Sequence, residues 1–216
     1  MLLPTTPVHI VYRLRGSLPH AEVNRIKDTY REQLRRIHEA HQRDAPKNHP
    51  THYEYRQART VLEVFRFRQY DNLLDRCETG PRFLEDPALK RVILRSWAKL
   101  EELGRVRIYA ISVMSNHVHV ILAATEEYDH RINSDDLMNH HKRFTATAIN
   151  RLRGTKGERV FAEFNYVRQI RPSALARVIR YVINNPVAAG LPVDPLQWCG
   201  SYLRPQYRHL FDGRAA

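Results

Sequence analysis

The sequence contains few cysteines and no long hydrophobic stretch. Only Cys77 and Cys199 are present among its 216 residues. Two distant thiols outside any metal-binding motif provide neither a disulfide framework nor a cysteine-based zinc site. No apolar run approaches the roughly 18 residues that a membrane-spanning helix needs, and the first residues lack the basic region and cleavage site of a secretion signal. We therefore expect a cytoplasmic protein with no membrane segment and with reduced thiols.

Negative charge is scarce relative to positive charge. The chain has 35 Lys and Arg residues against 23 Asp and Glu residues, which gives a formal net charge of +12. This excess predicts a polyanionic partner, with nucleic acid as the first candidate and an anionic membrane surface as the weaker alternative. Hydrophobic residues make up 43% of the chain, a share typical of globular proteins that excludes the intrinsically disordered class.

The spacing of apolar residues predicts an α+β fold. Val8, Ile10 and Tyr12 alternate with His9, Val11 and Arg13, as in a half-buried strand. In other segments the apolar residues recur at the spacing of an amphipathic helix. The predicted strands are Pro7–Arg15, Val106–Met114, His117–Ala123 and Phe164–Ile170, of which the middle two form a hairpin. The predicted helices are His20–Arg43, Glu54–Arg68, Asp86–Glu102, Asp135–Arg153 and Ala174–Asn184, with a loop at Asp44–Tyr53.

We predict a single domain over residues 1–216 with two elaborations. The order of strand, helices, hairpin, helix, strand and helix favours an antiparallel sheet with helices packed on it. The segment at about 20–53 is highly charged and has only a narrow apolar stripe, so we interpret it as a helical insertion. A C-terminal tail begins at about residue 192.

Two histidines in the predicted hairpin are candidate metal ligands. His117 and His119 lie two residues apart on a strand, so their imidazoles face the same way. They interrupt an apolar stretch, where burial of two polar rings costs free energy unless a metal or another partner satisfies them. The alternative interpretation is a hydrogen-bonded or solvated pair on a sheet face.

The last predicted helix carries a candidate nucleophile. Its core stripe contains Ile179 and Val182, and Tyr181 lies on the flank of that stripe. Asn185 follows four residues later and would share this flank if the helix continued that far. The alternative is a half-buried tyrosine at the edge of the core and an asparagine that ends the helix before Pro186.

Positive charge is concentrated between these two elements. Residues 141–180 contain ten Lys and Arg residues against Glu158 and Glu163, which accounts for +8 of the net charge. Such a run is often only a solvated face, but beside a candidate metal site it favours a surface that follows a phosphate backbone. The predicted DNA-binding residues are Lys142, Arg143, Arg151, Arg153, Lys156, Arg159, Arg168 and Arg180.

Three ordered motifs resemble the single-tyrosine HUH transposases, in particular the REP-associated tyrosine transposases and their insertion-sequence relatives. The sequence MSNHVHVI at 114–121 resembles the histidine signature, with Ser115 where proline is usual. The sequence RYVINNPV at 180–187, followed by AAGL, resembles the tyrosine-helix motif, and WCGSY at 198–202 resembles the C-terminal Trp-Ser-Ser-Tyr motif.

The resemblance implies both a fold and a chemistry. The fold would be a ferredoxin-like antiparallel sheet with helices on one face. His117, His119 and Asn185 would bind Mg²⁺ or Mn²⁺, and Tyr181 would attack single-stranded DNA beside a hairpin to form a 5′-phosphotyrosine. Strands would then be rejoined without ATP. The protein would associate with the nucleoid and act on hairpin-flanked repeats, as a monomer or as a homodimer.

Other functions remain open at this point. A domesticated DNA-binding protein could keep the same fold without cleaving DNA, and it is distinguished by whether the four site residues converge. Histidine-triad nucleotide hydrolases also place alternating histidines on a strand, but their third position is Ile121 here. Relaxases and replication-initiation nucleases share two histidines and a tyrosine, whereas the sequence around Asn185 and Pro186 favours the transposases.

Overall fold

The chain divides into two compact units. The computed structural model describes residues 1–44, 52–76, 79–191 and 194–212. One unit, called here the sheet unit, contains Met1–Ser17 and Pro81–Ala216, and the other, the helical hairpin unit, contains Leu18–Gly80. In the described part of the chain no helix has the length and apolarity needed to cross a bilayer.

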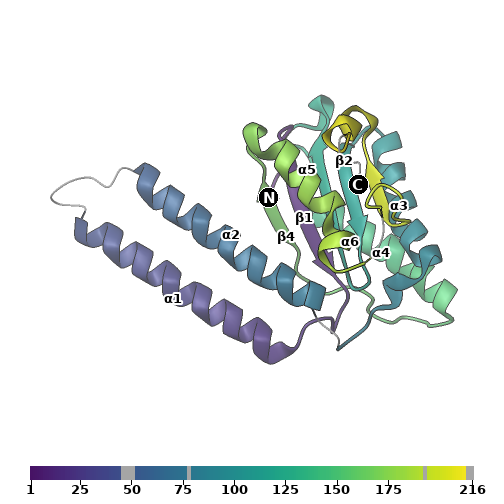
Figure 1. Cartoon of the computed structure of the whole chain (residues 1–216), viewed down its shortest axis with the longest axis horizontal. Helices are drawn as coiled ribbons and strands as arrows, with labels where there is room; N and C mark the ends of the chain where they lie inside the picture. The colour runs from purple at the N-terminus through teal and green to yellow at the C-terminus, as the bar shows by residue number, and fades with distance from the viewer. Residues whose placement is uncertain (45–51, 77–78, 192–193, 213–216) are drawn as a thin grey trace. The chain divides into compact units, whose positions relative to one another are not determined.

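The sheet unit has an antiparallel sheet of ferredoxin-like topology (Figure 1). Among the described residues, five strands lie in the order β4-β1-β3-β2-β5, and every neighbouring pair is antiparallel. Without β5, the chain order β1-α3-β2-β3-α4-β4 and this sheet order define a ferredoxin-like core, so the predicted fold class is confirmed. The strands are β1 (Val8–Arg13), β2 (Val106–Val113), β3 (His117–Ala124), β4 (Tyr166–Gln169) and β5 (Ser201–Leu203).

One face of the sheet packs against α3 (Pro87–Glu102) and α4 (Ser134–Arg153). Strand residues alternate between faces, so every second residue of the central strands enters this core. The helix boundaries follow from their caps. The side chain of Asp86 accepts a hydrogen bond from the Ala88 amide, the side chain of Asn133 accepts one from Asp135, and Gly154 ends α4 at a φ of 69°. The core side chains include Val8, Ile10, Tyr12, Val118, Val120, Leu122, Leu89, Ile93, Trp97, Leu137, Met138 and Ile149.

A buried polar network lies within this core. His141 of α4 shares a hydrogen bond of 2.7 Å with the Tyr12 hydroxyl through Nε2 and one of 2.9 Å with the Ser96 hydroxyl through Nδ1. The indole of Trp97 donates to the same tyrosine oxygen at 3.2 Å. Burial is the main reason that the pKa of His141 falls to about 3, and the positive charge of Lys142 adds to it.

Helices cover the other face of the sheet as well, which differs from the one-sided arrangement that the resemblance implied. Ile179, Val182 and Ile183 of α5 (Leu175–Ile183) pack on Tyr109 and Ala110 of β2 and on apolar residues of β3. All eight residues of β3 are buried, so the sheet needs cover on both sides. The short helix α6 (Asn185–Ala188) follows α5 directly.

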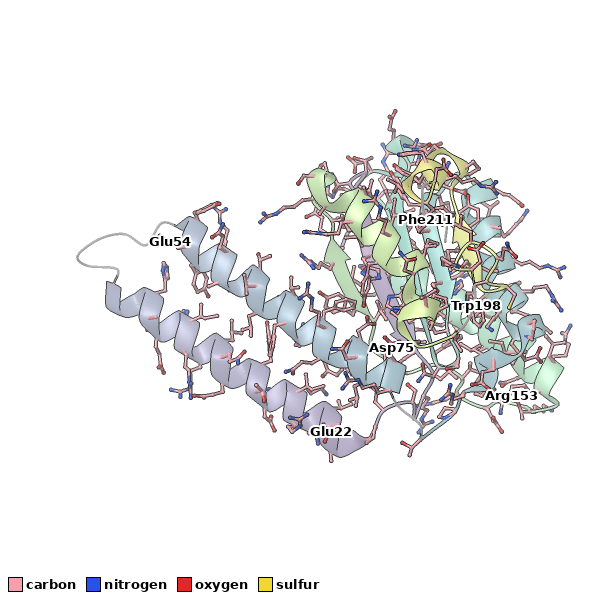
Figure 2. The ribbon with its side chains drawn as sticks, viewed as in Figure 1. Glu22, Glu54, Asp75, Arg153, Trp198 and Phe211 are labelled. Carbon is pink, nitrogen blue, oxygen red and sulfur yellow. The ribbon has the colours of Figure 1, made fainter. Side chains whose placement is uncertain are left out.

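Short elements complete the sheet unit. The four 3₁₀ turns among the described residues are Phe83–Glu85, Glu126–Tyr128, Pro172–Ala174 and Pro205–Leu210. In the C-terminal segment the Trp198 indole, labelled in Figure 2, donates to the Val113 carbonyl at 3.1 Å, and the Lys90 ammonium lies 3.8 Å from the centre of its ring. A Cβ at Gly200 would lie 2.5 Å from the Val113 oxygen, so this glycine permits the close approach.

The helical hairpin unit contains α1 (His20–Asp44) and α2 (His52–Arg76). The two helices contact each other through Tyr30, whose hydroxyl donates to Glu63 and whose ring lies 4.0 Å from the Arg66 guanidinium. Val23, from the apolar stripe predicted for the first helix, packs with Leu74. The second helix extends beyond the predicted Glu54–Arg68 at both ends. Most of the predicted loop Asp44–Tyr53 lies at residues 45–51, outside the described residues.

Candidate metal and tyrosine site

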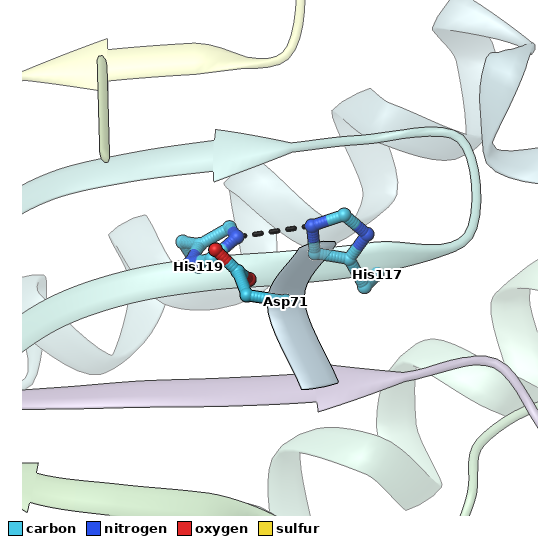
Figure 3. Close-up of side chains that lie close together, drawn as sticks. All are labelled: Asp71, His117 and His119. Atoms are coloured by element: carbon cyan, nitrogen blue, oxygen red, sulfur yellow. Dashed lines mark hydrogen bonds between the residues drawn. The ribbon is translucent and has the colours of Figure 1, made fainter. Parts of the chain in front are cut away.

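Three imidazoles lie together on the sheet face that α5 covers. His117 and His119 of β3 share this face because they are two residues apart on one strand, and Figure 3 shows their rings side by side. His9 joins them from the adjacent strand β1, where it lies opposite Ile121 in the pairing register. All three side chains are almost completely buried. Figure 3 also labels Asp71, a residue of the helical hairpin unit.

The ring nitrogens of the two β3 histidines are spaced as metal ligands would be. The Nε2 atoms of His117 and His119 are 3.0 Å apart, and two adjacent ligands of an octahedral divalent ion, each about 2.1 Å from it, are separated by about 3.0 Å. His117 also shares a hydrogen bond of 2.6 Å between its Nδ1 and the Asn116 side-chain oxygen. These imidazoles could therefore hold a metal ion.

Helix α5 brings Tyr181 to the histidines. The centre of its ring lies 6.0 Å from that of His119 and 6.3 Å from that of His9, and it meets both rings nearly edge-on. Ile179 and Val182, on the buried side of the helix, anchor it to the sheet. Tyr181 itself stays 39% exposed, so a large substrate can reach it.

Asn185 begins α6, four residues after Tyr181. Its side chain is 2% exposed, and its Oδ1 atom is buried with no hydrogen-bond partner among the described residues. A buried acceptor without a partner costs about 1–3 kcal/mol. An amide oxygen is a ligand that Mg²⁺ and Mn²⁺ accept, and imidazole nitrogens suit transition metals such as Mn²⁺. Two imidazoles and an amide oxygen are thus donor types that either ion accepts, and a role of Asn185 as the third ligand stays a prediction.

The predicted DNA-binding residues fall into separate groups. Five of them, Lys142, Arg143, Arg151, Lys156 and Arg159, line a cleft of about 740 Å³ between α4 and the segment 155–163. Arg168 lies directly opposite His9 in the β1–β4 register, so it shares the histidine face.

The other two basic residues lie elsewhere. The exposed Arg180 donates from Nε to the Leu210 carbonyl at 3.2 Å. Arg153, labelled in Figure 2, stacks on the Phe83 ring at 3.9 Å and pairs with Glu158. The eight residues therefore do not all line the cleft beside α4.

Lys142 differs from the other residues of the cleft. It is buried, and its ammonium donates to the carbonyls of Ala162 at 2.6 Å and Glu163 at 3.0 Å. Burial, followed by the positive charge of Arg13, lowers the pKa of Lys142 to about 8. These contacts bind the loop before β4 to α4, and a role of Lys142 in DNA contact stays a prediction.

His9 is the site residue that sequence reasoning missed. Its strand alternates, and the apolar residues Val8, Ile10 and Tyr12 enter the core beside α3 and α4, which leaves His9 on the opposite face. That signal was present in the sequence. Its significance depends on the pairing of β1 with β3, which brings together residues 110 positions apart.

Neither the protein-family models nor the curated protein sequences contain a match to this chain. Among solved structures, the chain matches that of a REP-associated tyrosine transposase bound to a REP hairpin. The match covers 93% of this chain and 78% of that chain, with 13% sequence identity and a TM-score of 0.46.

Proposed function

We propose that this protein is a metal-dependent endonuclease and transposase that acts on single-stranded DNA, with Tyr181 as its nucleophile. The observation that carries the proposal is the position of Tyr181, whose partly exposed ring lies edge-on to His119 beside two Nε2 atoms 3.0 Å apart. The motifs at 114–121 and 180–187 support the same assignment.

His117, His119 and Asn185 would hold the metal. When bound, a divalent ion neutralises charge on the scissile phosphate and orients it for in-line attack. The donor set supports this role because all three ligands are neutral, so the net positive charge of the ion stays available to the phosphate. The buried Oδ1 of Asn185 would gain the partner it lacks among the described residues.

Tyr181 would supply the attacking oxygen. Its phenol loses a proton to solvent, a bond forms between its oxygen and phosphorus, and the bond from phosphorus to the 3′-oxygen breaks. The released 3′-oxygen takes up a proton and becomes a free hydroxyl. Because one phosphodiester bond replaces another, attack by a 3′-hydroxyl on the phosphotyrosine rejoins strands without ATP. The ordinary phenol pKa is near 10, so deprotonation needs help at neutral pH.

Basic residues would hold the DNA on either side of this reaction. Arg168 lies on the histidine face, where it can contact the backbone near the scissile phosphate. Arg143, Lys156 and Arg159 line the cleft beside α4, which we assign to the phosphate backbone of an adjacent hairpin. Such an activity would place the protein with chromosomal DNA.

A denaturing gel tests this function. The full chain is mixed with labelled single strands that cover the DNA flanking its gene, with Mn²⁺ or with a chelator. We expect a covalent protein–DNA band that needs Mn²⁺, that disappears in Tyr181→Phe and that persists in Tyr166→Phe. Tyr166 is the matched control because it lies on β4 opposite Val11, on the same sheet face.

The outcomes separate the two candidate functions. Loss of the band in Tyr166→Phe but not in Tyr181→Phe would move the nucleophile to β4. Binding of the same strands that weakens with salt, with no covalent band from any strand, would instead support the domesticated DNA-binding protein. Tyr181→Phe should leave DNA affinity nearly unchanged because only one hydroxyl is removed.

A further inference from the structure

A line of hydrogen bonds joins four side chains through the candidate metal site. The His9 Nε2 atom lies 3.0 Å from His119 Nδ1, the Nε2 atoms of His119 and His117 are 3.0 Å apart, and His117 Nδ1 lies 2.6 Å from Asn116 Oδ1. The His9 ring is also stacked on that of His119, with ring centres 5.2 Å apart. All four side chains are at most 4% exposed.

The positions of the protons follow from counting donors. Asn116 Oδ1 can only accept, so His117 carries its proton on Nδ1 and accepts at Nε2. His119 then donates from Nε2 and accepts at Nδ1, and His9 donates to it from Nε2. With neutral rings, every contact in this line has one proton.

Metal binding through both Nε2 atoms requires the protons to lie on other ring nitrogens. A nitrogen that binds a metal must offer its lone pair, so the proton of His119 has to move to Nδ1. That proton then needs an acceptor, and the nearby ring of His9 provides one at Nε2 once its own proton lies on Nδ1. His117 needs no change, because its Nδ1 proton already faces Asn116.

We propose that His9 is a positioning residue that accepts a hydrogen bond from His119 and fixes the tautomer in which His119 binds the metal. The inference rests on the proposed function, since it assigns the ligands given there. An acceptor that bonds the N–H on the far side of a ligating imidazole orients the ring and makes its other nitrogen a better metal ligand. Asn116 likewise accepts a hydrogen bond from His117. His9 can accept from His119 when the metal is bound and donate to His119 when it is absent, so His9 suits both states of the site.

The strand pairing explains why His9 is placed for this role. Residues Val8 to Arg13 pair with β3 over the whole length of β1, and Val11 lies directly opposite His119. This pairing register fixes the position of His9 along β1 relative to His119 on β3. A side chain in this position must be able both to donate and to accept, which glutamine can do and leucine cannot.

Mn²⁺ affinity, measured by electron paramagnetic resonance on the full chain without DNA, tests the proposal. We expect His9→Leu to weaken Mn²⁺ binding about 10-fold to 100-fold, the usual effect of removing the hydrogen-bond acceptor of a ligating histidine. His9→Gln should restore most of that loss. The matched control is Val11→Ala, which alters packing directly opposite His119 and should leave Mn²⁺ affinity nearly unchanged.

The outcomes distinguish this inference from the proposed function. If the wild-type chain binds no Mn²⁺, the metal site itself is wrong. If the wild type binds Mn²⁺ and His9→Leu binds it equally well, the metal site stands and the role of His9 is refuted. If His9→Leu and Val11→Ala weaken Mn²⁺ binding equally, His9 contributes only packing and the proposal is refuted.

A spectroscopic measurement avoids the risk that a variant does not fold. The ¹⁵N shifts of the wild-type imidazoles, recorded with diamagnetic Mg²⁺, report which ring nitrogen carries the proton. We expect the proton of His119 on Nδ1 when the metal is bound and on Nε2 when it is absent. A proton on Nε2 in the Mg²⁺-saturated chain would overturn the proposal.

Discussion

The buried imidazole of His141 should make the sheet unit sensitive to mild acid. Its two nitrogens bond to the hydroxyls of Tyr12 and Ser96, and a neutral ring satisfies both because each hydroxyl can donate or accept. Burial, followed by the positive charge of Lys142, lowers the pKa of His141 from 6.5 to about 3. Folding therefore favours the neutral ring.

The size and direction of the effect follow from this shift. Below about pH 6.5 the unfolded chain takes up a proton that the folded chain does not accept until the pH approaches 3, so stability falls as the pH falls through this window. One pKa unit corresponds to about 1.4 kcal/mol. The full shift amounts to about 5 kcal/mol, of which about 2 kcal/mol is lost by about pH 5.

Urea unfolding at about pH 7.5 and about pH 5 measures this loss. Tryptophan fluorescence reports on the sheet unit, because Trp97, which stacks on His141, and Trp198 both belong to it. We expect His141→Gln to be less stable at the higher pH but to lose about 2 kcal/mol less than the wild type on acidification. The exposed His209→Gln is the control and should behave like the wild type. Equal losses in wild type and His141→Gln would refute the assignment.

Two further predictions concern the cleft beside α4. Lys156→Ala and Arg159→Ala should each reduce the salt dependence of binding to single-stranded DNA, by about 0.7 in the slope of log affinity against log salt; unchanged slopes would remove the cleft from the DNA path. Lys142→Met should instead lower the free energy of unfolding by about 2 kcal/mol, because the ammonium bonds two carbonyls. For Lys142→Met the slope of log affinity against log salt should stay close to that of the wild type. A marked decrease in this slope would show direct phosphate contact.

The sequence predicted elements whose signals are local. Strand alternation identified the shared face of His117 and His119, and the predicted helix Asp135–Arg153 agrees with α4 to within one residue. These features depend only on neighbouring residues. The predicted order of strands and helices was therefore sufficient to indicate the α+β class.

Other features depend on tertiary packing and could not be read in this way. The partnership of His9 with His119 needs the pairing of two distant strands, and the burial of Lys142 needs the loop that its ammonium holds. Strand β5 has only three residues, too few for a periodic pattern. The placement of α5 opposite α3 and α4 required knowledge that both faces of β3 are buried.

The division of the chain has a consequence for how the site assembles. The helical hairpin unit separates β1 from the remainder of the sheet unit in sequence, yet its two junctions are close together, since a Cβ at Gly16 would lie 3.7 Å from Pro81. Loop-closure entropy grows only with the logarithm of loop length, by about 0.6 kcal/mol per doubling. Insertions of different lengths at this junction are therefore thermodynamically cheap, and His9 meets His119 only where β1 is paired with β3.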